Sequence, residues 1–261
     1  MAAMIKPIFL LADSQLLFYR DEGGSVLERA RQLIEEEEPG KEILAAYIGA
    51  SNGDAREFYD LFVAAMDSIG IRTTRMIPSE PSDADKQFLD EADLILLAGG
   101  DVRRGWEVFQ QNGWAQKLVE RYYAGALLLG VSAGAVQLGL KGWDDEGKTF
   151  DTLRLVPFVI DAHDEPGWSH LLKVVPKAGE HARGFGIPTG GGAVYHPDYS
   201  VEPIRHPLTE ASLTEEGTVR QALLFPGETA EAEPEERGTF SPEVQSLLGT
   251  GGGPPDDDSV N

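Results

Sequence analysis

Short apolar runs alternate with segments of helical period through the first half of the chain. Polar residues bound each run, and each run has the length of a strand. Parallel strands buried on both faces are continuously apolar, and helical crossovers connect them. The pattern predicts an α/β fold, a mostly parallel sheet flanked by helices on both faces. The predicted strands are Pro7–Ala12, Ile43–Ile48, Ile71–Ile77, Leu94–Ala98 and Ala126–Val131.

Helix starts are marked by a capping residue that is followed three positions later by an acid. The pairs that fit this pattern are Ser25 with Glu28, Asp54 with Glu57, and Ser82 with Asp85. Gly70 is the expected C-cap of the helix that Asp54 opens. These signals predict three helices between the strands.

The pattern is looser after about Gly139. We expect a strand over Phe158–Ala162, a short helix over Glu165–Val174, and late strands, antiparallel at the sheet edge, over Ala193–Ile204 and Val219–Phe225. The length suits one domain, which we place at residues 1–226.

Residues 227–261 have a different composition from the rest of the chain. They carry nine acidic residues against one base, together with many prolines and glycines, and few apolar residues. Such a segment buries too little apolar surface to fold. We therefore expect a disordered acidic tail, interrupted by one short helix that begins at Ser241.

Composition narrows the classes of partner and chemistry. The chain has 44 acidic and 22 basic residues and a formal net charge of −22, which opposes binding to nucleic acid or to an anionic membrane. It has no cysteine, which excludes disulfides, thiolate metal sites and a cysteine nucleophile. The first apolar run is too short for a signal peptide, so we expect a soluble, cytoplasmic protein.

The sequence G-V-S-A-G-A at Gly130–Ala135 follows a predicted strand and precedes a predicted helix. Glycine on either side of the serine permits a sharp strand-to-helix turn that holds the Ser132 hydroxyl clear of the sheet. The same turn directs the first helical N–H groups, beginning with Ala133, toward a developing oxyanion. This arrangement predicts a nucleophilic serine, whereas the plain alternative is a tight turn in which Ser132 packs or caps the helix.

A second glycine turn, A-G-G-D at Ala98–Asp101, follows the strand over Leu94–Ala98. Carboxyl ends of parallel strands meet at one edge of a sheet, so the two turns are expected to converge. The N–H of Gly100 or Asp101 would then be a second oxyanion donor. The alternative is a loop in which Asp101 caps the next helix.

These motifs, with Asp161-Ala162-His163 about thirty residues after the serine, resemble the S51 peptidases, which include aspartyl dipeptidase and cyanophycinase. The resemblance covers about Ile5–Glu202. It implies the class I glutamine amidotransferase-like fold, a flavodoxin-like three-layer sandwich, with serine in place of the amidotransferase cysteine. It also implies a serine-nucleophile peptidase that acts on small peptides through an acyl-enzyme.

Carried over to this chain, the resemblance makes Ser132 the nucleophile and His163 the general base. Gly100 and Ala133 would supply the N–H groups of the oxyanion hole. Family members often continue with G-I-D-E, whose glutamate is proposed to complete the triad, but Gly186–Thr189 reads G-I-P-T. A carboxylate from elsewhere must therefore orient the imidazole.

Asp144, Asp145, Asp161 and Asp164 are the acids considered for this role. The sequence does not choose among them, and Asp144 and Asp161 are kept as catalytic candidates. The resemblance also implies aspartyl peptides, whose carboxylate requires a cation such as Arg103, Arg104 or Arg183. Solvated surface arginines are the alternative.

Two further residues are candidate substrate contacts. Asn52 follows the predicted strand over Ile43–Ile48, and Asp101 stands where the family usually has asparagine, in G-G-N-T. Asp54 and Asp101 as helix caps explain much of the same sequence.

Two rival functions remain open at this level. Asp161, His163, Asp164 and His170 could instead hold a divalent metal. Alternatively, the missing G-I-D-E glutamate and the acidic tail favour a catalytically impaired binding or regulatory protein on the same fold. We expect no cofactor and no metal, a small peptide as partner, and a homodimer as a candidate assembly.

Overall fold

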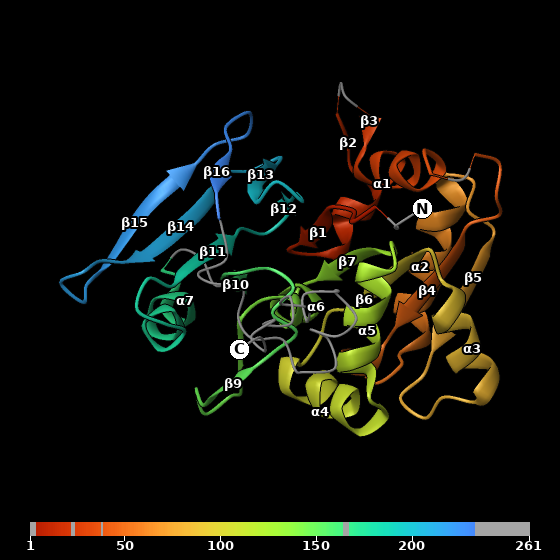
Figure 1. The fold of residues 1–261 in the computed structure, drawn as a ribbon, viewed down its shortest axis with the longest axis horizontal. Coiled ribbons are helices and arrows are strands. Elements are labelled where there is room, and N and C mark those ends of the chain that lie inside the picture. Colours follow the sequence, from red (N-terminus) through yellow and green to blue (C-terminus); the bar gives the residue numbers. More distant parts are fainter. Residues whose placement is uncertain (1–3, 22–23, 38, 164–166, 233–261) are drawn as a thin grey trace, which may run out of the picture.

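The computed structural model describes residues 4–21, 24–37, 39–163 and 167–232. A sheet of eight strands runs through its centre (Figure 1). In spatial order the strands are β16 (Ala230–Glu231), β13 (Ser200–Ile204), β12 (Gly192–Tyr195), β1 (Ile8–Leu11), β7 (Leu127–Val131), β6 (Leu94–Leu97), β4 (Leu44–Ile48) and β5 (Thr73–Ile77). The five strands from β1 to β5 in this order are mutually parallel, which confirms the five predicted strands.

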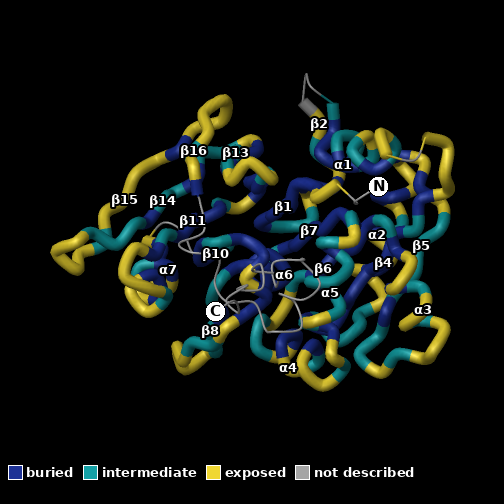
Figure 2. Tube along the Cα trace, in the orientation of Figure 1, coloured by how far each residue is buried: buried dark blue, intermediate teal, exposed yellow. Residues whose placement is uncertain are grey.

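Helices cover both faces of this sheet, as predicted. On one face lie η1 (Ser14–Phe18), α1 (Val26–Glu35) and α2 (Arg56–Ser68), and on the other lie α3 (Asp83–Glu91), α4 (Val102–Asn112), α5 (Trp114–Tyr123) and α6 (Ala133–Leu138). Successive residues of a strand point to opposite faces of the sheet. In β1, Phe9 and Leu11 pack against the helices of the first face, and Ile8 and Leu10 pack against those of the second. Figure 2 shows the buried strands between exposed outer loops.

The capping predictions hold at α1 and α3. Ser25 and Ser82 form reciprocal capping boxes with Glu28 and Asp85. Gly70 follows α2 in a left-handed conformation, with a φ of 78°.

The prediction that Asp54 caps α2 is wrong. The 3₁₀ turn η2 (Ala50–Asn52) precedes this helix, and the Asn52 side chain accepts the Ala55 N–H at 3.2 Å. Asp54 itself has a φ of 60°, outside the extended conformation of an N-cap residue, and its Oδ2 accepts the Ser79 N–H at 2.8 Å.

Four strands in the second half of the chain form a separate sheet, which the sequence did not predict. Its order is β10 (Val159–Ala162), β11 (Arg183–Ile187), β14 (Leu208–Leu213) and β15 (Val219–Leu224). The helices α7 (Ser169–Val174) and η3 (Val175–Lys177) pack against it. The predicted strand over Val219–Phe225 is therefore real but belongs to this second sheet, which projects beside the first in Figure 1.

The predicted strand over Ala193–Ile204 is two antiparallel strands, β12 and β13, because the chain reverses in the turn between them. Both lie toward the edge of the main sheet, as expected. Two small hairpins complete the described structure, β2–β3 (Arg20–Asp21, Gly24–Ser25) and β8–β9 (Lys141–Trp143, Thr149–Asp151).

Strand pairing continues slightly beyond the expected domain boundary at residue 226. The short strand β16 pairs with β13 through residues 230 and 231. Most of the acidic tail, with the helix predicted at Ser241, lies outside the described residues. Within the described part of the chain, no helix is both long and apolar enough to cross a lipid bilayer.

Candidate active site

Ser132 stands at a strained elbow between β7 and α6. Its φ of 49° and ψ of −111° lie in a region that non-glycine residues rarely adopt. The Ser132 N–H donates to the Leu11 carbonyl at 2.8 Å, and its carbonyl accepts the Val136 N–H at 3.1 Å. Strain of this kind persists only where surrounding contacts hold it, and it often marks functional sites.

Close backbone packing explains the glycines around the serine. A Cβ atom on Gly130 would lie 2.6 Å from the Ala135 backbone, and one on Gly134 would lie 2.1 Å from the Leu97 carbonyl oxygen. Side chains at either position would push α6 away from the ends of β6 and β7. The glycine spacing thus has the steric role that the sequence predicts.

The second glycine turn does converge on the elbow. A Cβ atom on Gly99 would lie 3.2 Å from the Ser132 Cβ. Gly100 has a φ of 137°, and a Cβ atom there would lie 2.2 Å from the Ser51 carbonyl oxygen. That carbonyl accepts the Asp101 N–H at 2.8 Å, so the N–H of Gly100 is the remaining oxyanion candidate in this turn.

The buried amide of Gln137 connects the loops that surround the elbow. Its Nε2 donates to Ser51 Oγ at 3.1 Å and to the Val102 carbonyl at 3.0 Å. Its Oε1 has no hydrogen-bond partner among the described residues. The amide holds η2, the start of α4 and α6 in one arrangement, and with them the amides of Gly100 and Ala133.

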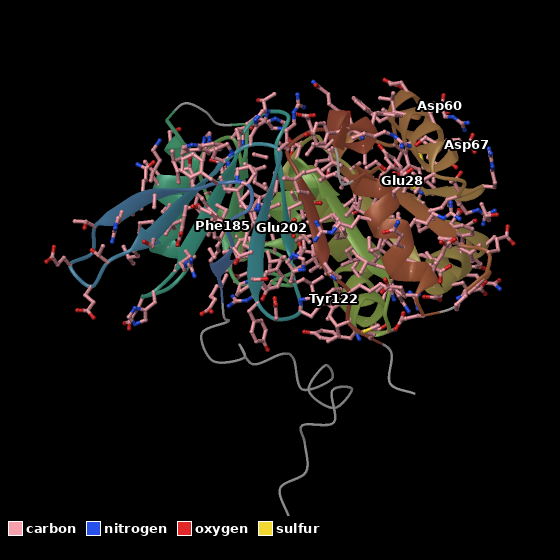
Figure 3. All side chains as sticks on the ribbon, turned by 90° about the horizontal axis from the view of Figure 1, so that it is seen from above. Glu28, Asp60, Asp67, Tyr122, Phe185 and Glu202 are labelled. Carbon is pink, nitrogen blue, oxygen red and sulfur yellow. The ribbon has the colours of Figure 1, made fainter. Side chains whose placement is uncertain are left out.

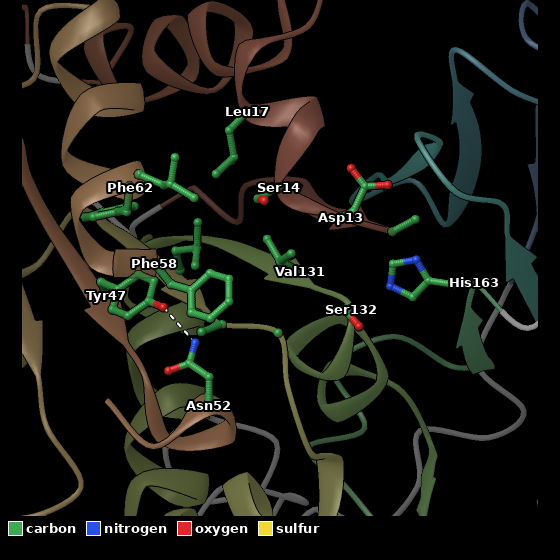
Figure 4. Close-up of a pocket in the computed structure, with 15 residues that line it drawn as sticks. Asp13, Ser14, Leu17, Tyr47, Asn52, Phe58, Phe62, Val131, Ser132 and His163 are labelled. Atoms are coloured by element: carbon green, nitrogen blue, oxygen red, sulfur yellow. Dashed lines mark hydrogen bonds between the residues drawn. The ribbon is translucent and has the colours of Figure 1, made fainter. Parts of the chain in front are cut away.

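His163 directly follows β10 and, like Ser132, has a positive φ, of 67°. Its N–H donates to the Ile187 carbonyl at 3.1 Å. Figure 4 shows its imidazole on the side of Ser132 away from Tyr47 and Phe58. Within the described residues no direct hydrogen bond joins the two side chains. Such bonds in unliganded sites often form only when substrate binds.

Ser132 and His163 line one pocket of about 190 Å³. Its other polar lining residues are Asp13, Ser14 and Asn52, and Gly99 also contributes. Asn52 Nδ2 donates to the Tyr47 hydroxyl at 2.9 Å. Burial raises the pKa of that Tyr47 phenol above its ordinary value of 10.0. The structure therefore brings together three predicted site residues: Ser132, His163 and Asn52.

Asp13 was not singled out from the sequence. It follows β1 and lines the pocket, with its carboxylate above His163 in Figure 4. Its Oδ1 accepts the Gln15 N–H at 2.9 Å, and its Oδ2 accepts the Gly190 N–H at 2.6 Å. Its place directly after a parallel strand is the one local signal that could have identified it.

The same contacts position the histidine. Ala12 donates its N–H to the Gly191 carbonyl at 2.9 Å, next to the Asp13–Gly190 bond. This loop follows Ile187, which binds the His163 N–H. The residues after β1 therefore hold the loop that follows β11, which contains the end of the G-I-P-T sequence. The end of β11 in turn binds the backbone of His163, directly after β10.

The two candidate orienting acids are engaged elsewhere. Asp161 is 2% exposed, and its Oδ2 accepts the Leu171 N–H of α7 at 3.0 Å. Asp144 Oδ1 accepts the N–H groups of Glu146 and Lys148 in the β8–β9 turn. Neither lines the pocket. Asp145 is exposed, and Asp164 lies outside the described residues.

The other candidate substrate contacts lie away from the pocket. Asp101 caps α4 by accepting the Arg104 N–H at 2.8 Å. Arg103 pairs with Glu107 at 2.8 Å and lies over the Phe150 ring. Arg104 is exposed, and its guanidinium lies against Gly53.

Arg183 does not have the expected role either, because its guanidinium pairs with Glu210 at 2.6 Å in the second sheet. None of the three predicted arginines lines the pocket.

The proposed metal ligands are not gathered either. Among the described residues, no group of three or more histidine or acidic side chains is placed to hold a metal ion. His170 stacks on Trp143, with 5.6 Å between ring centroids, and Asp161 binds the α7 backbone.

Comparisons with known proteins agree with this geometry. The model of peptidase family S51 matches residues 8–176, well over half of the chain. Peptidase E of Streptomyces coelicolor is 34% identical over 91 residues, which cover 31% of this chain and 37% of that relative.

Two solved structures share the fold. A peptidase from an acI-B1 actinobacterium has a TM-score of 0.65 and 16% identity, covering 88% of this chain and 98% of its own. A putative Peptidase E protein from Listeria monocytogenes has a TM-score of 0.55 and 18% identity, and the match covers 77% of this chain and 99% of the other. Sequence identities this low support a shared fold alone. The match to the family model is a match of sequence, over residues 8–176, and it supports membership of the family. The chain belongs to peptidase family S51.

Proposed function

We propose that this protein is a serine peptidase that cleaves small peptides through a covalent ester on Ser132. The observation that carries the proposal is the strained elbow, which presents the Ser132 hydroxyl in a pocket shared with His163. A residue held in this conformation for packing alone would more readily be glycine.

The reaction follows from these positions. Ser132 Oγ attacks the scissile carbonyl carbon while the His163 imidazole takes its proton. The N–H groups of Gly100 and Ala133 stabilise the oxyanion of the tetrahedral intermediate. The intermediate collapses as the C–N bond breaks, and His163 returns the proton to the leaving amine. Water, deprotonated by His163, then hydrolyses the ester and frees Ser132.

Asp13 supports this chemistry by position. It is the one carboxylate among the described residues that line the pocket, and it fixes the loop beside His163. We assign it the role of holding that loop, and we assign no orienting role to Asp144 or Asp161, whose carboxylates accept other N–H groups.

The test is amine release from a panel of dipeptides, which includes Asp-Xaa, β-aspartyl and apolar members. We expect the wild type to turn over at least one member, and Ser132→Ala and His163→Ala to lose that turnover. Ser212→Ala on β14 and His181→Ala, which is exposed, are matched controls that should retain it. Equal release by the wild type and Ser132→Ala would contradict the proposal and favour a binding protein.

A further inference from the structure

The pocket beside Ser132 has mostly apolar walls. Leu17 comes from η1, Tyr47 from β4, Val131 from β7, and Phe58, Leu61 and Phe62 from α2. Phe58 and Leu61 are 46% and 42% exposed, so they stand at the mouth and present apolar surface to solvent. A bound group that covered them would remove this surface from water.

The size of the pocket fits one side chain. Its volume is about 190 Å³. A cavity of about 150 Å³ lined by leucine, isoleucine and phenylalanine is large enough to bind benzene. A phenyl or branched aliphatic group therefore fits between η1 and α2.

The charge of the pocket opposes an acidic group. None of the described residues that line it is lysine or arginine, and its one carboxylate, Asp13, is negative. Arg103 and Arg183 pair with Glu107 and Glu210 outside it. A substrate carboxylate would lose its water here without gaining a cation, which is costly.

The reaction decides which side of the substrate enters. The leaving amine takes its proton from His163, so it must lie beside that imidazole. Figure 4 shows His163 on one side of Ser132, and Tyr47 and Phe58 on the other. The side chain of the acyl residue, attached on the opposite side of the scissile carbonyl, is then directed toward the apolar walls.

We propose that this pocket selects an aromatic or branched aliphatic side chain on the acyl side of the scissile bond and rejects aspartate. The inference rests on the serine peptidase function proposed above, and it names the substrate class of that same site. The residues that decide the selection are Phe58, Leu61 and Phe62 of α2.

The first experiment compares Phe-Ala, Leu-Ala and Asp-Ala, which share one leaving residue. We expect kcat/KM for Phe-Ala or Leu-Ala to exceed that for Asp-Ala by about tenfold or more, the scale on which apolar pockets discriminate. Binding of the same three dipeptides to Ser132→Ala, measured by calorimetry, should follow the same order without any hydrolysis.

The second experiment places a cation at the mouth of the pocket. Leu61→Lys should lower kcat/KM for Phe-Ala and raise it for Asp-Ala. Phe18→Lys adds the same charge at another exposed apolar position, 46% exposed and outside the lining, and should leave the preference unchanged. Both positions are on the surface, so both variants should fold.

The outcomes separate the two proposals. If the wild type cleaves Asp-Ala as well as or better than Phe-Ala and Leu-Ala, the pocket inference is overturned and the peptidase function stands. If nothing is cleaved but Ser132→Ala binds Phe-Ala in preference to Asp-Ala, the function fails and the pocket inference stands. Binding of none of the three, with no cleavage, overturns both.

Discussion

The backbone of Ser132 is held in a conformation that costs a non-glycine residue about 1–3 kcal/mol. Its N–H is tied to Leu11, its carbonyl to Val136, and Gly99 packs against its Cβ. These contacts come from β1, α6 and the turn after β6, so the fold itself supports the strain. In the proposed mechanism the hydroxyl is thereby in place before substrate binds, as in other preorganised sites.

Gly134→Ala should destabilise the protein by about 1–3 kcal/mol, because the new Cβ would meet the Leu97 carbonyl oxygen. The gain in helix propensity, about 1 kcal/mol, opposes this but does not remove a backbone clash. Urea unfolding measures the change. Gly167→Ala is the control, since no atom of the described residues lies within 4 Å of its Cβ position. Equal stability of the Gly134→Ala protein and the wild type would show that α6 does not pack as described.

Asp13→Asn should also destabilise the protein, by about 1–3 kcal/mol. Each oxygen of Asp13 accepts one N–H, from Gln15 and Gly190, and an asparagine side chain has only one oxygen. Its NH₂ group would face one of these donors unpaired. Thermal unfolding tests this against Asp145→Asn, an exposed control in the β8–β9 turn. An equal decrease in the thermal midpoint of both variants would argue against the role of Asp13 in holding the loop.

The sequence predicts the elbow well because its signal is local: two glycines and a serine within five residues. The pocket acid is a different case. Asp13 and Gly190 are separated by 177 positions, so their contact exists only once β1 and β11 are in place. Likewise, Asp161 is close to His163 in sequence, but its carboxylate binds the α7 backbone.

Between elements, α1 is joined to the edge of the main sheet by a charged cluster. Arg29 on α1 donates two hydrogen bonds to the Glu202 carboxylate on β13, at 2.8 and 2.7 Å, and His196 lies 2.9 Å from the same group. The position of Glu202 on the main sheet is labelled in Figure 3. The pKa of the Glu202 carboxyl is lowered to about 2 because Arg29 and then His196 hydrogen-bond to it.

This cluster gives a stability that depends on pH. The folded pKa of Glu202 lies below its ordinary value of 4.5, so the stabilisation is present above pH 4.5 and is lost as pH falls toward 2. The difference in unfolding free energy between wild type and Glu202→Gln should shrink over this window. Glu80→Gln, which makes the same change at an exposed position outside the cluster, is the control. A constant difference for Glu202→Gln would contradict the cluster.

The sequence predicted the elements that have strong local signals, whereas it did not predict those defined by distant pairing. The capping boxes of α1 and α3 lie within four residues each, and both form. The second sheet pairs β11 with β10 in parallel and with β14 antiparallel, and no local pattern specifies these partners. The Asp54 cap does not form, because the Asp54 backbone has a positive φ and its Oδ2 accepts the N–H of Ser79, which is distant in sequence.

At the scale of the whole molecule, charge is the dominant surface property. The net charge is −22, and acidic side chains such as Asp60 and Asp67 on α2 project from the outer helices (Figure 3). Repulsion among so many like charges destabilises a compact state and keeps it soluble. The pocket beside Ser132 is an exception, because its lining is mostly apolar and contains one carboxylate, that of Asp13.

Added salt should therefore stabilise the folded protein. Raising the ionic strength from about 0.01 M to about 0.1 M shortens the screening length from about 30 Å to about 10 Å. We expect the thermal midpoint to rise over this range with either NaCl or KCl, since the effect is general screening. A midpoint that falls or stays constant would show that attractive ion pairs outweigh the repulsion.

The central claim is that Ser132 forms a covalent acyl-enzyme, and the most direct test is to isolate it. Wild type and Ser132→Ala would be mixed with p-nitrophenyl esters of phenylalanine, leucine and aspartate, quenched in acid, and mapped by peptide mass spectrometry. Ser14→Ala, which removes the other serine hydroxyl of the pocket, controls for labelling at a neighbouring serine. The account predicts one acyl group on Ser132 in the wild type and in Ser14→Ala, and none in Ser132→Ala. An acyl group on another residue, or turnover of the esters that persists in Ser132→Ala, would contradict it.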